Sequence, residues 1–86
     1  MKTIEETITK LESNYKFADF QVNYWLKQAS EECKNGLKKE SKASEDIAQS
    51  YMERRTEIAI MYGYIMEIDY IDAIHKLKDM CERNAE

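Results

Sequence analysis

The chain has 86 residues, of which 43% are hydrophobic and 35% charged, and its formal net charge is −4 at pH 7. This length leaves room for one small domain, expected over residues 1–86. The acidic balance argues against nucleic acid as the main ligand, because phosphate binding needs clustered lysine and arginine. The longest apolar stretch, Ile58 to Met66, is too short to cross a bilayer, and Met1 to Glu6 contain no secretory apolar segment. We therefore expect a cytoplasmic protein without a membrane partner.

Residues that form turns are almost absent from the chain. The sequence contains no proline and only two glycines, Gly36 and Gly63. Because strand-and-turn folds need such residues at each reversal, this composition predicts an all-α fold. The two cysteines, Cys33 and Cys81, are too few for a disulfide framework, and each falls on an apolar side near the end of a predicted helix. They are interpreted as buried apolar side chains, with a single bridge between the helix ends as the alternative.

Residues 4–35 are expected to form the first helix. Thr3 and Glu6 fit a capping box, in which the hydroxyl and the carboxylate each satisfy a free backbone N–H at the helix start. Gly36, with Lys34 before it and Leu37 after it, predicts the end of this helix. Between these signals, apolar residues recur at alternating spacings of four and three: Ile4, Ile8, Leu11, Tyr15, Ala18, Val22, Trp25 and Ala29. This heptad pattern predicts a helix packed lengthwise on another helix, as in a coiled coil.

A basic linker is expected over residues 36–43, and a second helix over residues 44–83. Ser44 is the favoured N-cap because Glu45 and Asp46 follow it, where the helix dipole favours acids; Ser41 is the competing cap. No helix stop follows before the C-terminus. The two helices would then form a long antiparallel hairpin.

The second helix carries two neighbouring apolar stripes rather than one narrow seam. One contains Ile47, Tyr51, Ile58, Met61, Ile65 and Ile68, and the other Ala48, Met52, Ala59, Tyr62, Met66, Tyr70, Ile74, Leu77 and Cys81. Residues 58–66 are apolar all round, which predicts burial on more than one side. A break near Gly63 would convert the hairpin into a three-helix bundle. A β-strand over residues 58–70 is a further alternative, because every even position there is Ile, Tyr or Met.

The first helix carries more apolar surface than one neighbouring helix can cover. Phe17, Phe20 and Tyr24 form a second stripe, nearly opposite Ala18 and Val22. Leaving a large aromatic side chain in water forfeits about 1.5–3 kcal/mol relative to burial, and an exposed stripe of this kind usually marks an interface. The stripe could pair two hairpins into a dimeric four-helix bundle, bind a different protein, or lie inside a monomeric three-helix core.

A second candidate surface lies on the second helix. From Thr56 to His75 the sequence contains no lysine or arginine, and tyrosines are interleaved among the acids. Tyrosines bury a large rigid area and keep a polar tip, so they are frequent in binding hot spots. The partner-binding residues predicted on this helix are Tyr62, Tyr64, Glu67, Asp69 and Tyr70. Such a face suits a basic protein surface, and an ordinary solvated helix face is the alternative.

No recognisable catalytic motif occurs in the sequence: it contains no Cys/His pair, Ser/His/Asp set, Gly-rich phosphate loop or zinc spacing. No cofactor and no metal are therefore predicted. Asp72 and His75, at i and i+3, resemble an element of di-metal helical bundles, so a metal-dependent all-α hydrolase with acids on the second helix is one alternative. The four lysines from Lys34 to Lys42 leave a nucleic-acid-associated accessory protein as another.

The favoured interpretation is a non-catalytic protein–protein interaction module. A short acidic chain with spare aromatic surface suits a small inhibitor or adaptor that occludes or bridges a larger protein. By analogy with the many small proteins of this kind in phage and mobile elements, we expect such an element to encode the chain. We expect the chain to form a homodimer and also to bind an unidentified protein.

Overall fold

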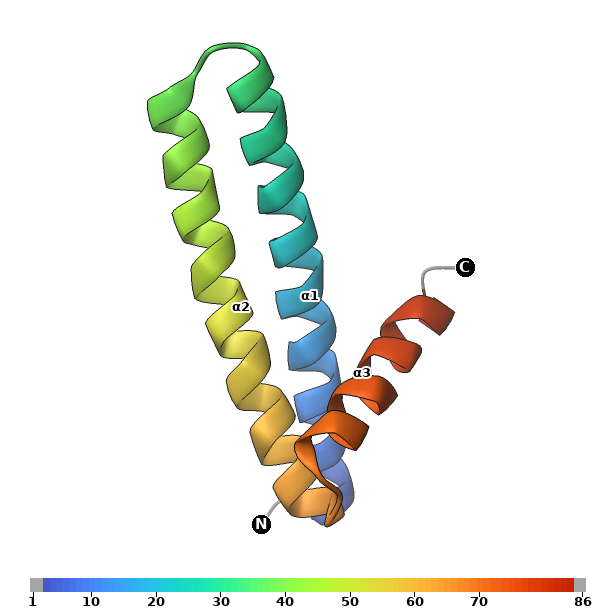
Figure 1. Cartoon of the computed structure of the whole chain (residues 1–86). Helices are drawn as coiled ribbons and strands as arrows, with labels where there is room; N and C mark the ends of the chain where they lie inside the picture. Colours follow the sequence, from blue (N-terminus) through green and yellow to red (C-terminus); the bar gives the residue numbers. More distant parts are fainter. Residues whose placement is uncertain (1–2, 85–86) are drawn as a thin grey trace.

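The computed structural model describes residues 3–84, and its regular elements are three α-helices (Figure 1). α1 spans Ile4–Lys34, α2 spans Lys38–Met66 and α3 spans Tyr70–Asn84. Within residues 3–84 there is no strand, so the predicted all-α class is confirmed. The alternative of a strand over residues 58–70 is wrong, because these residues belong to α2, the turn after it and the first residue of α3.

Both predicted ends of α1 agree with the structure. The Thr3 hydroxyl accepts a hydrogen bond from the Glu6 N–H at 3.1 Å, as a helix N-cap does. At the other end, Gly36 has a φ of 78° and Leu37 N–H donates to the Glu32 carbonyl at 2.9 Å. Gly36 N–H donates to the Cys33 carbonyl at 3.1 Å, which completes a Schellman motif. The left-handed backbone at position 36 explains why glycine stands there.

The start of α2 differs from the expected Ser44 cap and from the expected linker over residues 36–43. The helix begins at Lys38, without a side-chain cap, so the connection is much shorter than predicted. Both serines instead bond to α1: Ser41 Oγ donates to the Ala29 carbonyl at 2.8 Å, and Ser44 Oγ donates to the Glu32 carboxylate. These small polar side chains are buried between the two helices near the hairpin tip.

The second half of the chain is not the single helix expected over residues 44–83. α2 runs through Gly63 to Met66, and Glu67 then adopts a left-handed conformation with φ 58° and ψ 41°. The Ile68 N–H donates back to the Gly63 carbonyl at 3.0 Å and closes the turn. Asp69 caps the start of α3, since its carboxylate accepts from the Asp72 N–H at 2.9 Å. The alternative weighed from the sequence placed a break near Gly63; the structure has a third helix, with the break at residues 67–69 rather than at the glycine.

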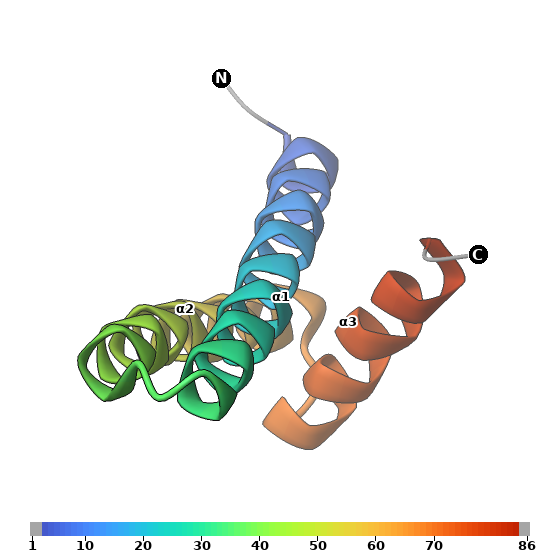
Figure 2. The ribbon, with the colours of Figure 1, turned by 90° about the horizontal axis from the view of Figure 1, so that it is seen from above.

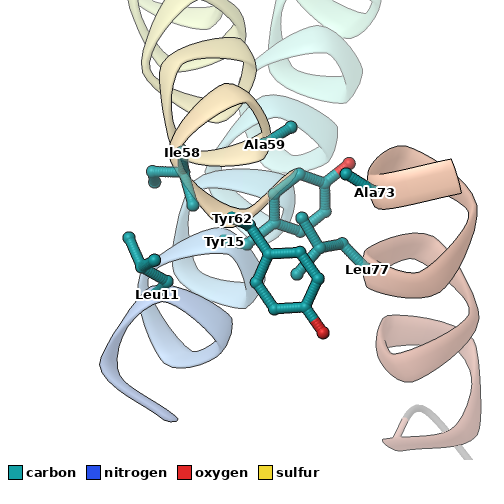
Figure 3. Packing of buried hydrophobic residues seen from close by; sticks show 7 residues of the cluster. All are labelled: Leu11, Tyr15, Ile58, Ala59, Tyr62, Ala73 and Leu77. Atoms are coloured by element: carbon teal, nitrogen blue, oxygen red, sulfur yellow. The ribbon is translucent and has the colours of Figure 1, made fainter. Parts of the chain in front are cut away.

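The main core lies where the three helices meet, at the end of the hairpin far from the α1–α2 turn (Figure 3). Its buried members are Leu11 and Tyr15 from α1, Ile58, Ala59 and Tyr62 from α2, and Ala73 and Leu77 from α3. Towards the tip, α1 and α2 bury mainly small side chains, such as Ala29 and Ala48. Of the predicted α1 heptad positions, only Ile4 is exposed, because it lies in the first turn beyond this core.

The molecule is elongated. Its radius of gyration is 15.1 Å, whereas a compact domain of this length is expected to have about 12 Å. Its accessible surface is 6521 Å², against roughly 5,300 Å² for a compact folded monomer of 10.2 kDa. α3 diverges from the hairpin, and its C-terminal end stands clear of α2 in both views (Figures 1 and 2). The open arrangement leaves apolar side chains uncovered on the long helices.

Candidate protein-binding surfaces

An aromatic surface, formed by Phe17, Phe20 and Tyr24, lies on the outward side of α1. The three side chains are 53%, 64% and 50% exposed. Because an α-helix turns about 100° per residue, Phe20 points nearly opposite Ala18 and Val22, which are buried. The alternative in which this stripe forms an internal core is therefore wrong for the single chain. The hairpin covers one side of α1 and leaves the aromatic side in solvent.

The rings of this surface are ordered by contacts with one another and with α2. Phe17 meets the ring of Tyr51 edge-on, with centroids 6.1 Å apart and an interplanar angle of 76°. Phe20 and Tyr24 stack at 6.4 Å, and Tyr24 meets Trp25 edge-on at 5.1 Å. The Trp25 indole N–H is in turn held by the Gln21 side chain at 3.1 Å. Such contacts restrict the rings before any partner binds, which lowers the entropy lost on association.

The five partner-binding residues predicted on the second helix do not share one exposed surface in the structure. Tyr62 is only 4% exposed, and its hydroxyl donates to the Glu12 carboxylate at 3.3 Å, so its predicted role in partner binding is wrong. Tyr62 faces the core because it lies on the stripe of α2 that meets α1 and α3. Asp69 is exposed, but one of its carboxylate oxygens caps α3. Glu67 and Tyr70 are exposed on either side of the turn between the helices.

A different apolar group is exposed on the outward side of α2. Ile60, Met61 and Tyr64 are 54%, 52% and 87% exposed, and we call them the α2 outer surface. Burial on more than one side was predicted for residues 58–66, but these three side chains are exposed because α1 and α3 both pack against the opposite side of α2. Tyr64 points away from the core because it follows the buried Tyr62 by two residues, or about 200° around the helix. Counting the available neighbouring helices would have indicated this exposure.

The cysteines also differ from expectation. Cys33 is exposed near the hairpin tip, where the short turn covers little of the helix, and Cys81 is half-buried against α1 and α2; both are free thiols. Burial and the nearby Asp19 carboxylate raise the pKa of the Cys81 thiol. A raised pKa lowers the thiolate population, which makes this thiol a weaker nucleophile. Cys81 lines a shallow polar cleft between α3 and the hairpin, with Asp19, Asn23, Arg55, Lys78 and Glu82.

The acids of the second half do not converge into a metal site. Asp79 pairs with Arg83 at 2.7 Å along α3, and Asp69 caps the same helix. Among the residues that the structure describes, no group of three or more His, Cys, Asp or Glu side chains could hold a metal ion. Among the described residues, no further metal-ligating side chain therefore joins Asp72 and His75.

Comparisons with protein-family models, with curated proteins and with solved structures each found no match to this chain. Within residues 3–84, none of the helices combines the length and apolar character that crossing a membrane requires.

Proposed function

We propose that this chain is a non-catalytic protein–protein interaction module, a small inhibitor or adaptor, and that it forms a homodimer through the aromatic surface of α1. The observation that carries the proposal is the exposure of Phe17, Phe20 and Tyr24, each at least half open to solvent on one helix face. Aromatic side chains are enriched at the centres of interfaces, where they bury a large rigid area.

The excess accessible surface of the chain favours a second copy as the partner that covers the aromatic surface. A stable interface buries about 800 Å² on each partner. The chain exposes roughly 1,200 Å² more than a compact monomer of its mass, so an interface of that size fits within the excess. Two hairpins that pack along α1 form a four-helix arrangement, in which the aromatic rings take the place of a shared core.

Replacing Phe20 with glutamate tests this function. A charge at the centre of the aromatic surface should convert the dimer into a monomer in sedimentation equilibrium, while the helical circular dichroism signal remains because Phe20 is 64% exposed in the single chain. Ser30→Glu is the matched control, since Ser30 is an exposed α1 residue away from the aromatic stripe and the charge change is the same. A wild-type protein that stays monomeric at high concentration would contradict the proposal.

A further inference from the structure

The α2 outer surface is an apolar patch bordered by acids at both ends. Glu53 and Glu57 precede Ile60 by seven and three residues, and Glu67 follows Tyr64 by three. These spacings place the two preceding glutamates on the same side of α2 as the patch, and Glu67 directly after its end. All three glutamates are exposed. The patch therefore combines uncovered apolar area with negative charge before and after it along the chain.

Positive charge is scarce around this patch. The sequence between Thr56 and His75 contains no lysine or arginine. Two cations precede it directly: Arg55 pairs with Asp19 of α1 at 2.7 Å, and Arg54 has its guanidinium carbon 5.7 Å from the centroid of the Tyr51 ring. The field over Ile60, Met61 and Tyr64 is consequently set by the glutamates, with Asp69 and Asp72 following at the start of α3.

We propose that the α2 outer surface binds a basic amphipathic helix of another protein. The apolar side of that helix would cover Ile60, Met61 and Tyr64, and its lysines or arginines would lie near Glu57 and Glu67. Those two glutamates are ten residues apart, or about 15 Å along a helix, so the cations are needed about three turns apart. This inference rests on the proposed function as a protein-binding module and names the chemistry of its partner.

The surface is free when the chain is a dimer. The aromatic surface and the α2 outer surface belong to different helices, and each lies opposite its own helix's buried stripe. Because those buried stripes face each other across the hairpin, the two surfaces face away from each other. Pairing through α1 then leaves both copies of the α2 outer surface open, so a dimer presents two equivalent docking sites, as an adaptor requires.

The test uses two labelled 18-residue helical peptides as probes, with the full chain at about 0.15 M salt. One peptide carries a leucine stripe bordered by lysines, and the other carries the same stripe bordered by glutamates. Fluorescence anisotropy should show saturable binding of the lysine peptide and at least about tenfold weaker binding of the glutamate peptide. Equal binding of the two peptides, or no binding of the lysine peptide, would overturn the proposal.

Matched variants locate the site. Tyr64→Ser should weaken binding of the lysine peptide by about tenfold, while Ile4→Ser, at an exposed apolar position outside both surfaces, should leave it unchanged. Glu57→Lys should also weaken it, whereas Glu40→Lys, which makes the same charge change at an exposed position near the hairpin tip, should not. Equal losses in both lysine variants would mean general attraction to an acidic protein and would contradict the proposed site.

Sedimentation equilibrium distinguishes a failure of this inference from a failure of the proposed function. If the lysine peptide does not bind while Phe20→Glu still abolishes the dimer, the partner chemistry is wrong and self-association stands. If Tyr64→Ser itself dissociates the dimer, the α2 outer surface is covered by a second copy, and the docking of a basic helix there is wrong.

Discussion

Two polar contacts join the hairpin helices beside the core. The Arg55 Nη1 and Asp19 Oδ1 atoms are 2.7 Å apart, and both side chains are about one quarter exposed, at 25% and 23%. The Tyr62 hydroxyl donates to the Glu12 carboxylate at 3.3 Å. Each contact links α1 to α2, so each favours one longitudinal register of the hairpin. Near the tip the small alanines specify that register less by shape, and the bonds from Ser41 and Ser44 to α1 favour it there.

The buried tyrosines make stability fall at high pH. Burial raises the pKa of Tyr15 and Tyr62 above the ordinary 10.0, and for Tyr62 the neighbouring Glu12 carboxylate adds to the effect. The folded chain thus holds these protons more tightly than the unfolded chain. Their contribution is fully present below the unfolded tyrosine pKa and is lost as pH rises through the higher folded values.

Replacing Tyr62 with phenylalanine tests this contact. The free energy of unfolding at pH 7 should fall by about 1 kcal/mol, because the bond to Glu12 is lost. The decline of stability above pH 10 should also become shallower, since one raised tyrosine pKa is removed. Urea unfolding at several pH values measures both effects. Tyr64→Phe, at a position 87% exposed, should leave the pH 7 value unchanged, and an equal loss there would contradict the assignment.

At the scale of the elements, the turn between α2 and α3 decides the shape of the molecule. Gly63 allows the following turn to approach closely, because a Cβ there would lie 3.1 Å from the Ile68 carbonyl oxygen and 3.4 Å from the Ala73 Cβ. Glu67 adopts a left-handed backbone conformation, which favours glycine over other residues. Asp69 then caps α3. The sequence predicted Asp69 as a partner-binding residue within one continuous helix, so its role as a cap emerges only from the structure.

Glu67→Gly should stabilise the chain. Left-handed backbone costs a residue with a Cβ roughly 1–2 kcal/mol, and the greater freedom of unfolded glycine offsets part of the gain. We expect the free energy of unfolding to rise by about 0.5 kcal/mol, measured by urea titration. Gly36→Ala is the reciprocal control, because φ is 78° at that position and alanine should lower stability. A destabilised Glu67→Gly protein would mean that this turn does not adopt the left-handed conformation.

At the scale of the whole molecule, charge is distributed unevenly along the hairpin. Residues 34–42 at the tip carry four lysines and one glutamate, while residues 3–9 at the opposite end carry Glu5 and Glu6 and no lysine or arginine. A two-fold axis along the helices would place each residue beside its own copy, with lysines facing lysines. An axis across the helices places the basic tip of one copy beside the acidic end of the other. The proposed dimer is therefore expected to be antiparallel.

Cross-linking distinguishes the two orientations. Lys10 precedes Phe17 by seven residues and Glu31 follows Tyr24 by seven, so both border the aromatic surface symmetrically. In a Cys33→Ser, Cys81→Ala background, neither Lys10→Cys nor Glu31→Cys alone should cross-link with a short thiol-reactive linker. An equimolar mixture of the two should yield a covalent dimer on a denaturing gel. Cross-linking of each variant with itself would instead indicate a parallel dimer.

The helical class, both ends of α1 and the buried heptad face could be predicted from the sequence, because these depend on local capping, breaker content and periodicity. It also identified Phe17, Phe20 and Tyr24 as side chains that a single neighbouring helix leaves uncovered. The division of the second half at residues 67–69, and the burial of Tyr62 beside the exposed Tyr64, depend on how the helices pack. On a helix that is apolar all round, the local pattern favours no face, so the placement of α1 and α3 determines which side chains reach solvent.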